Sequence, residues 1–367
     1  MELVYINFVP ENFTGVKKKI EMQCNAFSNC GYNVIQTGFE ENQFLYNNKP
    51  IFKISSKNRF IRKIIEPLLF YKILSKINKN VDVIYIRYMR ITPWYYFFLK
   101  KLSEKANKLI VEIPAYPFDN EYKKKSLLSF SDFYFRKRLN EIVDFFTFFG
   151  PEISNIWGIS SIQLMNGIDI NSIKVVNKTV KFETLDLLCV ASLAEWHGFD
   201  RLIKSLASTS NLSIKEKITI HIVGDGSIKN NLLSLVNDLG LSNQVNFYGF
   251  LNGDKLDEIF NSASIGVSSL CLHRIGHDNI TPIKPSEYTA RGIPFILANN
   301  DPRFEEANFV FRVKNDESII NFVELYNWYF DNNFISQEIR EYASKYLSWE
   351  IQINKIINKI QDSKNNK

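Results

Sequence analysis

Apolar, β-branched runs alternate with segments of helical periodicity along most of this chain, and this alternation strongly constrains the fold. A first series of predicted strands covers Leu3–Val9, Tyr32–Thr37, Val83–Arg87, Lys108–Ile113 and Phe145–Phe149. Predicted helices between them include Val16–Asn29 and Pro93–Asn107. Strands that alternate with helices favour βαβ units, in which crossover helices join parallel strands. The sequence therefore predicts an α/β protein with parallel sheets.

A second series of the same kind follows in the other half of the chain. Its predicted strands are Leu185–Ala191, Ile218–Val223, Val245–Tyr248, Ile265–Ser268 and Pro294–Ala298. The helices expected between them are Gly198–Ser208, Ile228–Leu239 and Lys255–Asn261. Because 367 residues exceed one ordinary hydrophobic core, two series indicate two doubly wound domains. The polar stretch Asn166–Glu183 is the expected linker, and apolar residues at helical spacing over Ser348–Ile360 predict a terminal helix.

Charge is unevenly distributed between the two halves. Residues 1–170 hold 24 Lys and Arg against 16 Asp and Glu, a net charge of +8, and the remainder hold 21 against 23. Such an excess favours anionic partners, although a solvated surface also carries charge. Within the basic half, Lys57–Lys79 combines seven basic residues with one acid and many large apolar side chains. This segment suits either an anionic membrane surface or a packed helix with a basic outer face, and Pro67 is expected to divide it into two short helices.

Cysteine usage and hydropathy indicate a compartment. The four cysteines, Cys24, Cys30, Cys189 and Cys271, show neither close pairing nor zinc-finger spacing, which favours a reduced, cytosolic setting. No segment approaches 18 uninterrupted apolar residues, and the first apolar run lacks the pattern of a signal peptide. We expect a cytoplasmic protein, with peripheral attachment at the inner face of the cytoplasmic membrane left open. Nucleic-acid binding would depend on charge alone, and we do not expect it.

The segment Ser268–Ala298 carries the densest set of chemically useful side chains. A polar loop with His273 and Arg274 follows a predicted strand and leads into Lys284 and Glu287, before a Gly-Ile-Pro turn and the next strand. Ligands of open parallel sheets bind just outside the carboxyl ends of the strands. Lys, His and Arg side chains with one Glu at such a place suit a nucleotide that carries both phosphates and a ribose.

Five motifs in a fixed order connect the second half of the chain to a known family. They are Asn166–Asp169 (NGID), Ala191–Asp200 (ASLAEWHGFD), Val223–Gly226 (VGDG), Val245–Phe250 (VNFYGF) and Pro285–Phe295 (PSEYTARGIPF). The chain resembles the retaining glycosyltransferases of GT-B fold called group 1 or family 4, especially those of bacterial capsule and surface-polysaccharide clusters. Each motif is weak by itself, and their order makes the resemblance specific.

The resemblance implies a GT-B architecture of two Rossmann-like domains with a central cleft. Residues 1–170 would form the acceptor domain and residues 171–347 the donor domain, with a terminal helix over 348–367 packing back on the first domain. The reaction would move a sugar from a nucleotide-sugar donor to a saccharide acceptor with retention. A polyprenyl-diphosphate-linked acceptor would fit a membrane-associated enzyme of polysaccharide biosynthesis. No cofactor and no metal are expected, and no Asp-x-Asp motif occurs in a fitting place.

The resemblance also assigns candidate residues. Glu287 would accept the ribose hydroxyls, with a helix N-terminal acid as the alternative. The other candidates for donor binding are Ser286, Asp278, Asn279, Gly224, Gly249, Phe250 and Gly15. On the acceptor side we expect Glu112 and Tyr116, from the segment Glu112–Pro117 that ends a predicted strand of the first domain.

Two departures from the family pattern shift the expected roles. The family has two glutamates separated by seven residues, and the first of them falls at Asn279, so Asp278 or Asn279 is expected to hold the transferred sugar. The family's Arg and Lys that bind the diphosphate fall at Ser192 and His197. We therefore expect His197, Lys284 and Arg274 to supply the catalytic charge. The alternatives are a packed loop histidine and solvated surface cations, and His221 within a strand is expected to be structural.

Two rival functions remain at this stage. A nucleotide-sugar epimerase on the same fold would convert the donor without an acceptor. A non-catalytic partner that binds a nucleotide or glycan would fit the loss of the first glutamate and both usual cations. A Rossmann oxidoreductase is disfavoured because no Gly-x-Gly-x-x-Gly follows the first predicted strand.

Overall fold

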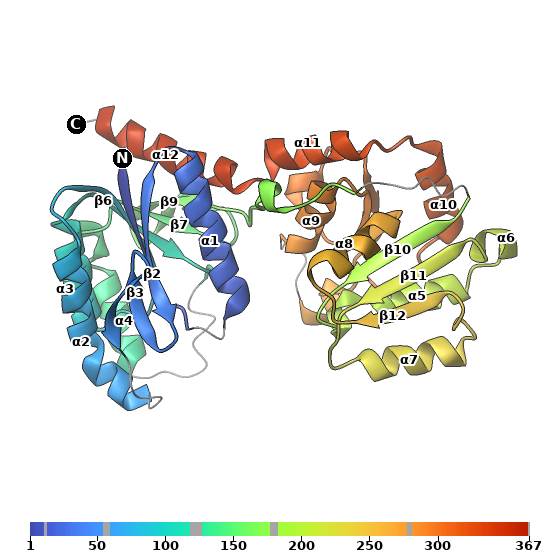
Figure 1. Cartoon of the computed structure of the whole chain (residues 1–367), viewed down its shortest axis with the longest axis horizontal. Coiled ribbons are helices and arrows are strands. Elements are labelled where there is room, and N and C mark those ends of the chain that lie inside the picture. Colours follow the sequence, from blue (N-terminus) through green and yellow to red (C-terminus); the bar gives the residue numbers. More distant parts are fainter. Residues whose placement is uncertain (11–12, 54–58, 118–126, 177–182, 277–280, 366–367) are drawn as a thin grey trace. The chain divides into compact units, whose positions relative to one another are not determined.

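The computed structural model describes residues 1–10, 13–53, 59–117, 127–176, 183–276 and 281–365. The chain divides into two compact units (Figure 1). The first comprises Met1–Met165 together with Trp349–Lys367, and the second comprises Asn166–Ser348. The boundaries observed after Met165 and Ser348 lie close to those expected at residues 170 and 347.

The first unit is built on a mostly parallel sheet in the order β4-β3-β2-β1-β5-β6-β7-β9-β8. Its parallel strands are β1 (Glu2–Ile6), β2 (Asn33–Glu40), β5 (Val81–Arg87), β6 (Ala106–Ile113), β7 (Phe145–Phe148) and β9 (Ile159–Gln163). The antiparallel strands at its two edges are β3 (Gln43–Tyr46), β4 (Lys49–Lys53) and β8 (Asn155–Ile156). The central strands carry continuous buried apolar runs, as expected of parallel strands covered on both faces.

Helices cover both faces of this sheet (Figure 1). On one face α1 (Thr14–Asn29) and α12 (Trp349–Asn365) pack over Tyr5 and Tyr85. On the other face α2 (Arg59–Lys76), α3 (Pro93–Ser103) and α4 (Leu127–Arg136) pack over Ile6 and Ile84. Neighbouring residues of one strand thus serve different cores, which follows from the alternation of side chains along a strand. The terminal segment that follows the second unit completes the first one.

The second unit has a wholly parallel sheet in the order β12-β11-β10-β13-β14-β15. Its strands are β10 (Leu185–Val190), β11 (Ile218–Val223), β12 (Val245–Gly249), β13 (Ile265–Val267), β14 (Phe295–Leu297) and β15 (Val310–Arg312). Its helices are α5 (Phe199–Ala207), α6 (Leu212–Lys215), α7 (Lys229–Asp238), α8 (Gly253–Ser262), α9 (Ile283–Arg291), α10 (Phe322–Asp331) and α11 (Ser336–Tyr346). Each unit is therefore Rossmann-like and doubly wound, as predicted.

Two features of the first unit differ from the prediction. The helix α2 runs through Pro67 without division. Leu69, Phe70 and Ile73 follow the proline and are buried against the sheet and α3, and this packing offsets the backbone hydrogen bond that the proline cannot make. The predicted helix Pro93–Asn107 ends at Ser103, because β6 already begins at Ala106.

No helix in the described ranges has both the length and the apolar character needed to cross a bilayer.

Candidate functional site

The strand order of the second unit reverses between β10 and β13, which creates a place where two loops meet. β11 and β12 extend the sheet on one side of this pair, and β14 and β15 extend it on the other. The loop after β10 hydrogen-bonds the loop after β13, because Leu270 N donates to His197 O at 3.0 Å and Cys271 N donates to Trp196 O at 3.2 Å. Such a topological switch point is where open parallel sheets bind ligands.

His197 is fixed within the loop that follows β10. Its Nδ1 accepts a hydrogen bond from Ala194 N at 3.2 Å, so the proton of the neutral ring lies on Nε2. The ring stacks on Phe199 with centroids 5.6 Å apart. The next residue, Gly198, has φ +66°, and an added Cβ would lie 2.6 Å from Cys271 Sγ. This turn therefore requires glycine, and it holds the imidazole at the switch point.

Lys284 is the second residue of α9, and its ammonium group is buried. Within the described part of the chain its Nζ has no hydrogen-bond partner. The Phe199 ring lies 5.7 Å from Nζ, and burial lowers the pKa of Lys284 from 10.5 to about 7, with a small opposing effect from the Cys189 thiol. A buried lysine without a counter-ion costs stability. An anionic ligand would supply that missing counter-ion.

His197 and Lys284 influence each other electrostatically. Burial and, to a lesser extent, the Lys284 charge together lower the pKa of His197 to about 3. The imidazole is therefore neutral at physiological pH and can donate from Nε2, while Lys284 can gain or lose its charge near neutrality. The two side chains can therefore bind an anion together. His197 would donate a hydrogen bond from Nε2, and Lys284 would become positively charged by taking up a proton.

The amino end of α9 adds a further preference for anions. The helix begins at Ile283, and its first turn contains no acidic residue. Exposed N–H groups and the helix dipole favour a phosphate at such an end. One turn later, the Glu287 carboxylate is about one-third exposed at 32%, and among the described residues only Arg291 bonds it, at 3.3 Å through Oε1. The carboxylate therefore retains acceptor capacity for a ligand.

Ser286 has a structural hydrogen bond that the sequence did not suggest. Its Oγ accepts from Arg303 Nη1 at 2.8 Å, and both residues are buried. Arg303 also pairs with Asp301 at 2.6 Å and donates to Pro282 O at 2.8 Å. This network fixes the segment that leads into α9. Ser286 thus positions the helix, and its buried hydroxyl does not face solvent.

Arg274 does not have the free guanidinium that a phosphate-binding role needs. Its nitrogens bond Asp200 at 2.9 and 3.0 Å, Glu317 at 2.7 Å through two nitrogens, and Glu195 O at 2.7 Å. His273 shares Glu317, with Nε2 2.8 Å from its carboxylate. Arg274 therefore ties the loop after β10 to the loop after β13, and we correct its expected catalytic role to a structural one.

The glycines of the Val-Gly-Asp-Gly turn allow two backbone segments to approach closely. A Cβ on Gly224 would lie 1.8 Å from Ala191 O, and one on Gly226 would lie 2.2 Å from Leu193 O. Gly249, with φ +69°, ends β12 and accepts from Gly224 N at 2.7 Å. Phe250 follows it with its ring 75% exposed, open to stacking by a flat ligand.

Asp278 and Asn279, expected near the sugar, lie outside the described residues.

His221 bonds inside the sheet, as expected of a structural histidine. Its Nε2 lies 2.8 Å from Asp186 Oδ1, and its Nδ1 lies 2.8 Å from the Tyr248 hydroxyl.

In the first unit, Glu112 lies in a buried polar network at the carboxyl half of β6. The carboxylate is fully buried, and it accepts from Arg87 Nη1 at 2.5 Å, Gln23 Nε2 at 2.7 Å and the Tyr85 hydroxyl at 2.8 Å. Burial lowers the pKa of the nearby Lys19 to about 8, with an opposing effect from Glu112. The Glu112 carboxylate is therefore committed to internal partners, and a direct acceptor contact does not fit this arrangement.

Tyr116 and Gly15 are the other two candidate residues of the first unit. The Tyr116 ring is partly buried, 5.8 Å from the Phe148 ring, and its carbonyl lies 2.4 Å from the position of a Cβ on Gly150. Gly15 is exposed near the start of α1, and no atom of the described residues beyond its chain neighbours and the backbone of its own helix lies within 4 Å of an added Cβ. Among the described residues, no contact therefore requires glycine at position 15.

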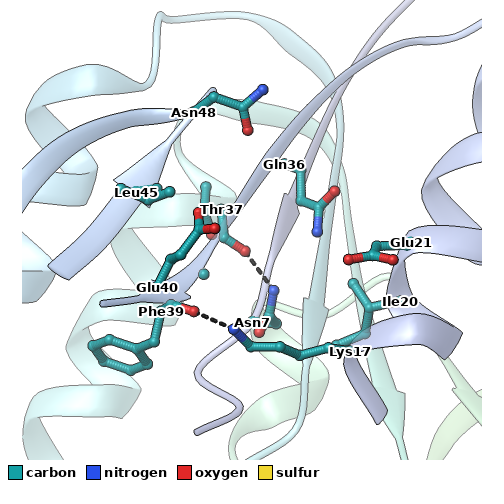
Figure 2. Close-up of a pocket in the computed structure, with 11 residues that line it drawn as sticks. Asn7, Lys17, Ile20, Glu21, Gln36, Thr37, Phe39, Glu40, Leu45 and Asn48 are labelled. Carbon is teal, nitrogen blue, oxygen red and sulfur yellow. Dashed lines mark hydrogen bonds between the residues drawn. The ribbon is translucent and has the colours of Figure 1, made fainter. Parts of the chain in front are cut away.

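A polar cavity of about 270 Å³ lies between the ends of β1 and β2 and the first turns of α1 (Figure 2). At its base, Asn7 Nδ2 donates to Thr37 O, and Lys17 Nζ donates to Phe39 O at 2.5 Å. The Thr37 Oγ1 is buried and has no hydrogen-bond partner among the described residues. Gln36 and Glu21 also line the cavity (Figure 2). The sequence did not predict this cavity, because Asn7 falls inside the predicted strand Leu3–Val9, whereas β1 ends at Ile6.

One set of side chains in the described ranges has metal-ligand chemistry: Cys271, His273 and Glu317. The Glu317 carboxylate is already bonded through both oxygens by Arg274 and through Oε1 by His273. A metal ion there would have to displace the guanidinium, so these residues do not fit a metal site as arranged.

Comparisons with known proteins also point to the second unit. Residues 174–346, slightly less than half of the chain, match the family model for glycosyl transferases group 1. No curated protein matches the chain significantly.

Solved structures of the same fold cover the whole chain. A glycosyltransferase from Rickettsia africae has a TM-score of 0.65 and 14% identity, covering 100% of this chain and 99% of that one. The lipopolysaccharide outer core galactosyltransferase WaaB has a TM-score of 0.61 and 15% identity, covering 98% and 99%. HepE from Anabaena, solved with UDP, has a TM-score of 0.59 and 14% identity, covering 99% and 100%.

At these identities the structural likeness establishes the fold. The residues that match the family model lie within the second unit. The second unit carries a glycosyl transferases group 1 domain, and the chain as a whole has the two-domain GT-B fold of glycosyltransferases.

Proposed function

We propose that this protein transfers a sugar from a nucleotide-sugar donor to a saccharide acceptor with retention of anomeric configuration. The observation that carries the proposal is Lys284, a buried amine without a partner among the described residues, beside neutral His197 at the switch point of the donor-type domain. The diphosphate of a nucleotide-sugar supplies the counter-ion that Lys284 lacks. HepE from Anabaena, which shares the fold, has been solved with UDP and with UDP-glucose.

The chemical step follows from where charge develops. The bond between the anomeric carbon and the β-phosphate oxygen breaks, and the acceptor hydroxyl oxygen bonds that carbon from the same face. The hydroxyl proton passes to the departing phosphate. Negative charge therefore grows on the β-phosphate, where the Lys284 ammonium, the His197 Nε2–H and the α9 amino end stabilise it in a water-poor site. These groups carry the needed charge without a metal, so we propose a metal-independent reaction with no cofactor.

Glu287 would hold the nucleoside. Its carboxylate lies one turn inside α9 from Lys284 and keeps acceptor capacity beyond its 3.3 Å contact with Arg291. A ribose offers two neighbouring hydroxyl donors, which match the two oxygens of a carboxylate. Phe250, exposed after β12, would stack on the base.

The cavity of Figure 2 would receive a sugar of the acceptor. Its lining combines amides, a hydroxyl and the carboxylates Glu21 and Glu40, and its one lysine already bonds a carbonyl. This mixture suits a neutral, hydroxyl-rich group better than an anion. Thr37 Oγ1 would gain a partner in such a complex.

We extend the proposal to a polyprenyl-diphosphate-linked acceptor in bacterial surface-polysaccharide biosynthesis, including capsule, in the cytoplasm at the inner face of the membrane. The support is the resemblance of the five ordered motifs and the basic segment that includes α2.

Donor binding tests the proposal first. A thermal-shift panel of UDP-, GDP-, dTDP- and CMP-sugars is applied to the wild type, Glu287→Ala and the control Lys255→Met, an exposed lysine on α8. Stabilisation of the wild type and the control by one donor, with loss in Glu287→Ala, supports the assignment. Equal stabilisation of all three proteins removes Glu287 from the site, and no stabilisation by any donor refutes nucleotide-sugar binding.

A further inference from the structure

Exposed apolar side chains of the first unit gather on three neighbouring helices. They are Leu68 and Tyr71 on α2, Trp94 and Phe97 on α3, and Phe130, Phe133 and Tyr134 on α4, each between 52% and 70% exposed. We call these seven residues the aromatic face. Elsewhere in the described part of this unit, large apolar side chains of similar exposure are limited to Met1 and Phe13. Such concentration on one layer differs from the scattered exposure of an ordinary surface.

The seven side chains share one side of the unit because their helices form one layer on the sheet (Figure 1). α3 packs against α2 through Phe70 and Phe98, whose rings stack at 4.4 Å, and against α4 through Tyr96 and Phe135 at 4.8 Å. Each helix buries one side in the core below. The aromatic face occupies the opposite sides, at the spacing of three or four residues expected for one helix face.

Exposed cations accompany the aromatic face on the same helices. The Lys137 ammonium lies 4.7 Å from the Phe133 ring centroid, and the Arg138 guanidinium lies 4.4 Å from that of Tyr134. The exposed cations on or just after these helices are Lys72, Lys76, Lys79, Lys100, Lys101, Lys137 and Arg138. The exposed acids over the same described stretches are Glu104, which pairs with Lys101 at 2.5 Å, and Glu141. The described parts of these three helices thus expose aromatic side chains together with a clear excess of cations over acids.

We propose that the aromatic face docks the protein on the surface of an anionic lipid bilayer. Aromatic rings are stable at the level of lipid headgroups, and lysine and arginine side chains reach from there to the phosphates. Each basic residue near an anionic surface adds attraction that salt weakens. A second copy of this chain fits less well, because self-pairing would bring these cations together. The inference does not depend on the donor or acceptor assignments.

The composition of the three helices explains why sequence alone pointed to only part of this surface. The basic segment Lys57–Lys79 suggested α2, but five of the seven side chains of the aromatic face come from α3 and α4. Their exposure becomes visible only when the fold shows which sides of α3 and α4 face the core. Docking therefore depends on Phe97 and Phe133 at least as much as on the lysines of α2.

The test measures cosedimentation of the full chain with phosphatidylcholine vesicles that contain or lack phosphatidylglycerol, at low and high ionic strength. One variant combines Phe97→Ser with Phe133→Ser, and another combines Lys100→Glu with Lys137→Glu, which leaves the rings in place. The matched control combines Leu212→Ser with Ile319→Ser, two exposed residues of the second unit. Thermal unfolding and light scattering of each variant verify folding and oligomeric state.

We expect the wild type and the control to bind anionic vesicles at low salt and to dissociate as salt rises. Both test variants should bind at least about 10-fold more weakly, because apolar area and charge act together. Tryptophan fluorescence of the wild type should also be quenched by brominated lipids, and Trp94→Phe should remove most of that quenching. Absence of wild-type binding, or equal binding by the variants and the control, overturns the proposal. A dimer that the variants dissociate, with vesicle binding unchanged, assigns the face to protein contact and equally overturns it.

Discussion

Binding of a nucleoside diphosphate should be coupled to protonation of Lys284. Without a ligand, burial holds the pKa of this amine at about 7, so at pH 8 roughly 10% of the molecules carry the charge. One negative charge about 4 Å away contributes about 4 kcal/mol at an effective dielectric of 20, or about 3 pKa units. A bound diphosphate would therefore return the pKa of Lys284 to about 10. At pH 8, binding should take up about 0.9 proton per site.

Isothermal titration calorimetry measures this uptake directly. UDP or the diphosphate selected by the donor panel is titrated in buffers of different ionisation enthalpy, and the slope of the binding enthalpy gives the number of protons. His197 should contribute little at pH 8, because its pKa of about 3 lies far below that pH. Lys284→Met should abolish the uptake and weaken binding by about 100-fold, as expected for a lost charged hydrogen bond. The exposed Lys255→Met is the control and should leave both unchanged.

The same shift predicts the pH dependence of stability without ligand. The folded-state pKa of Lys284 is lowered, so between about pH 7 and 10 the unfolded chain binds more protons than the folded chain at this position. Stability should therefore rise with pH over this window in the wild type relative to Lys284→Met. Proton uptake that is equal in wild type and Lys284→Met, or absent from both while UDP still binds, would refute the role given to this lysine.

Three further predictions concern neighbouring groups. Glu287→Ala should weaken binding of the selected diphosphate by about 10-fold or more. The wild type should bind the 2′-deoxy nucleotide more weakly than the ribonucleotide, and Glu287→Ala should bind both equally. If both proteins discriminate equally, Glu287 does not bind the ribose. Arg274→Ala should lower the free energy of unfolding by about 1–3 kcal/mol in urea titrations, because Asp200 and Glu317 lose their partner, while the folded variant keeps its donor affinity. Thr37→Val should raise the KM for the acceptor with donor affinity unchanged, and it should not destabilise the free protein, because its Oγ1 has no partner to lose among the described residues; an unchanged KM would exclude the cavity as the acceptor site.

The architecture was largely predictable because parallel strands covered on both faces leave long apolar runs. β11 was predicted with its observed bounds, Ile218–Val223, since both its ends coincide with polar turns. The hairpin of β3 and β4 was not predicted. Its strands are short and half-exposed, and Asn47, Asn48 and Lys49 separate their short apolar runs. Edge strands of this kind are defined by pairing with the sheet, which a local pattern does not contain.

The candidate site was predictable in location more than in role. Lys284 and Glu287 were selected from their motif, and both lie on α9 beside the switch point. The sequence did not distinguish Lys284 from Arg274, because their difference depends on distant partners. Glu317, which occupies the Arg274 guanidinium, lies 43 residues further along the chain, whereas none of the described residues hydrogen-bonds Lys284 Nζ. Likewise, Ser286 is committed to Arg303 from a later loop.

Acceptor-dependent release of a nucleoside diphosphate tests the central claim most directly. The protein is incubated with the nucleotide-sugar panel and a lipid extract of bacterial membranes, and mass spectrometry and NMR follow the nucleotide, the product and its anomeric configuration. We predict that one donor yields diphosphate in equal amount to a glycosylated product with the donor's configuration, and that Lys284→Met loses this activity while Lys255→Met keeps it. Conversion of the donor sugar without an acceptor, an inverted product, or full activity of Lys284→Met would contradict the account.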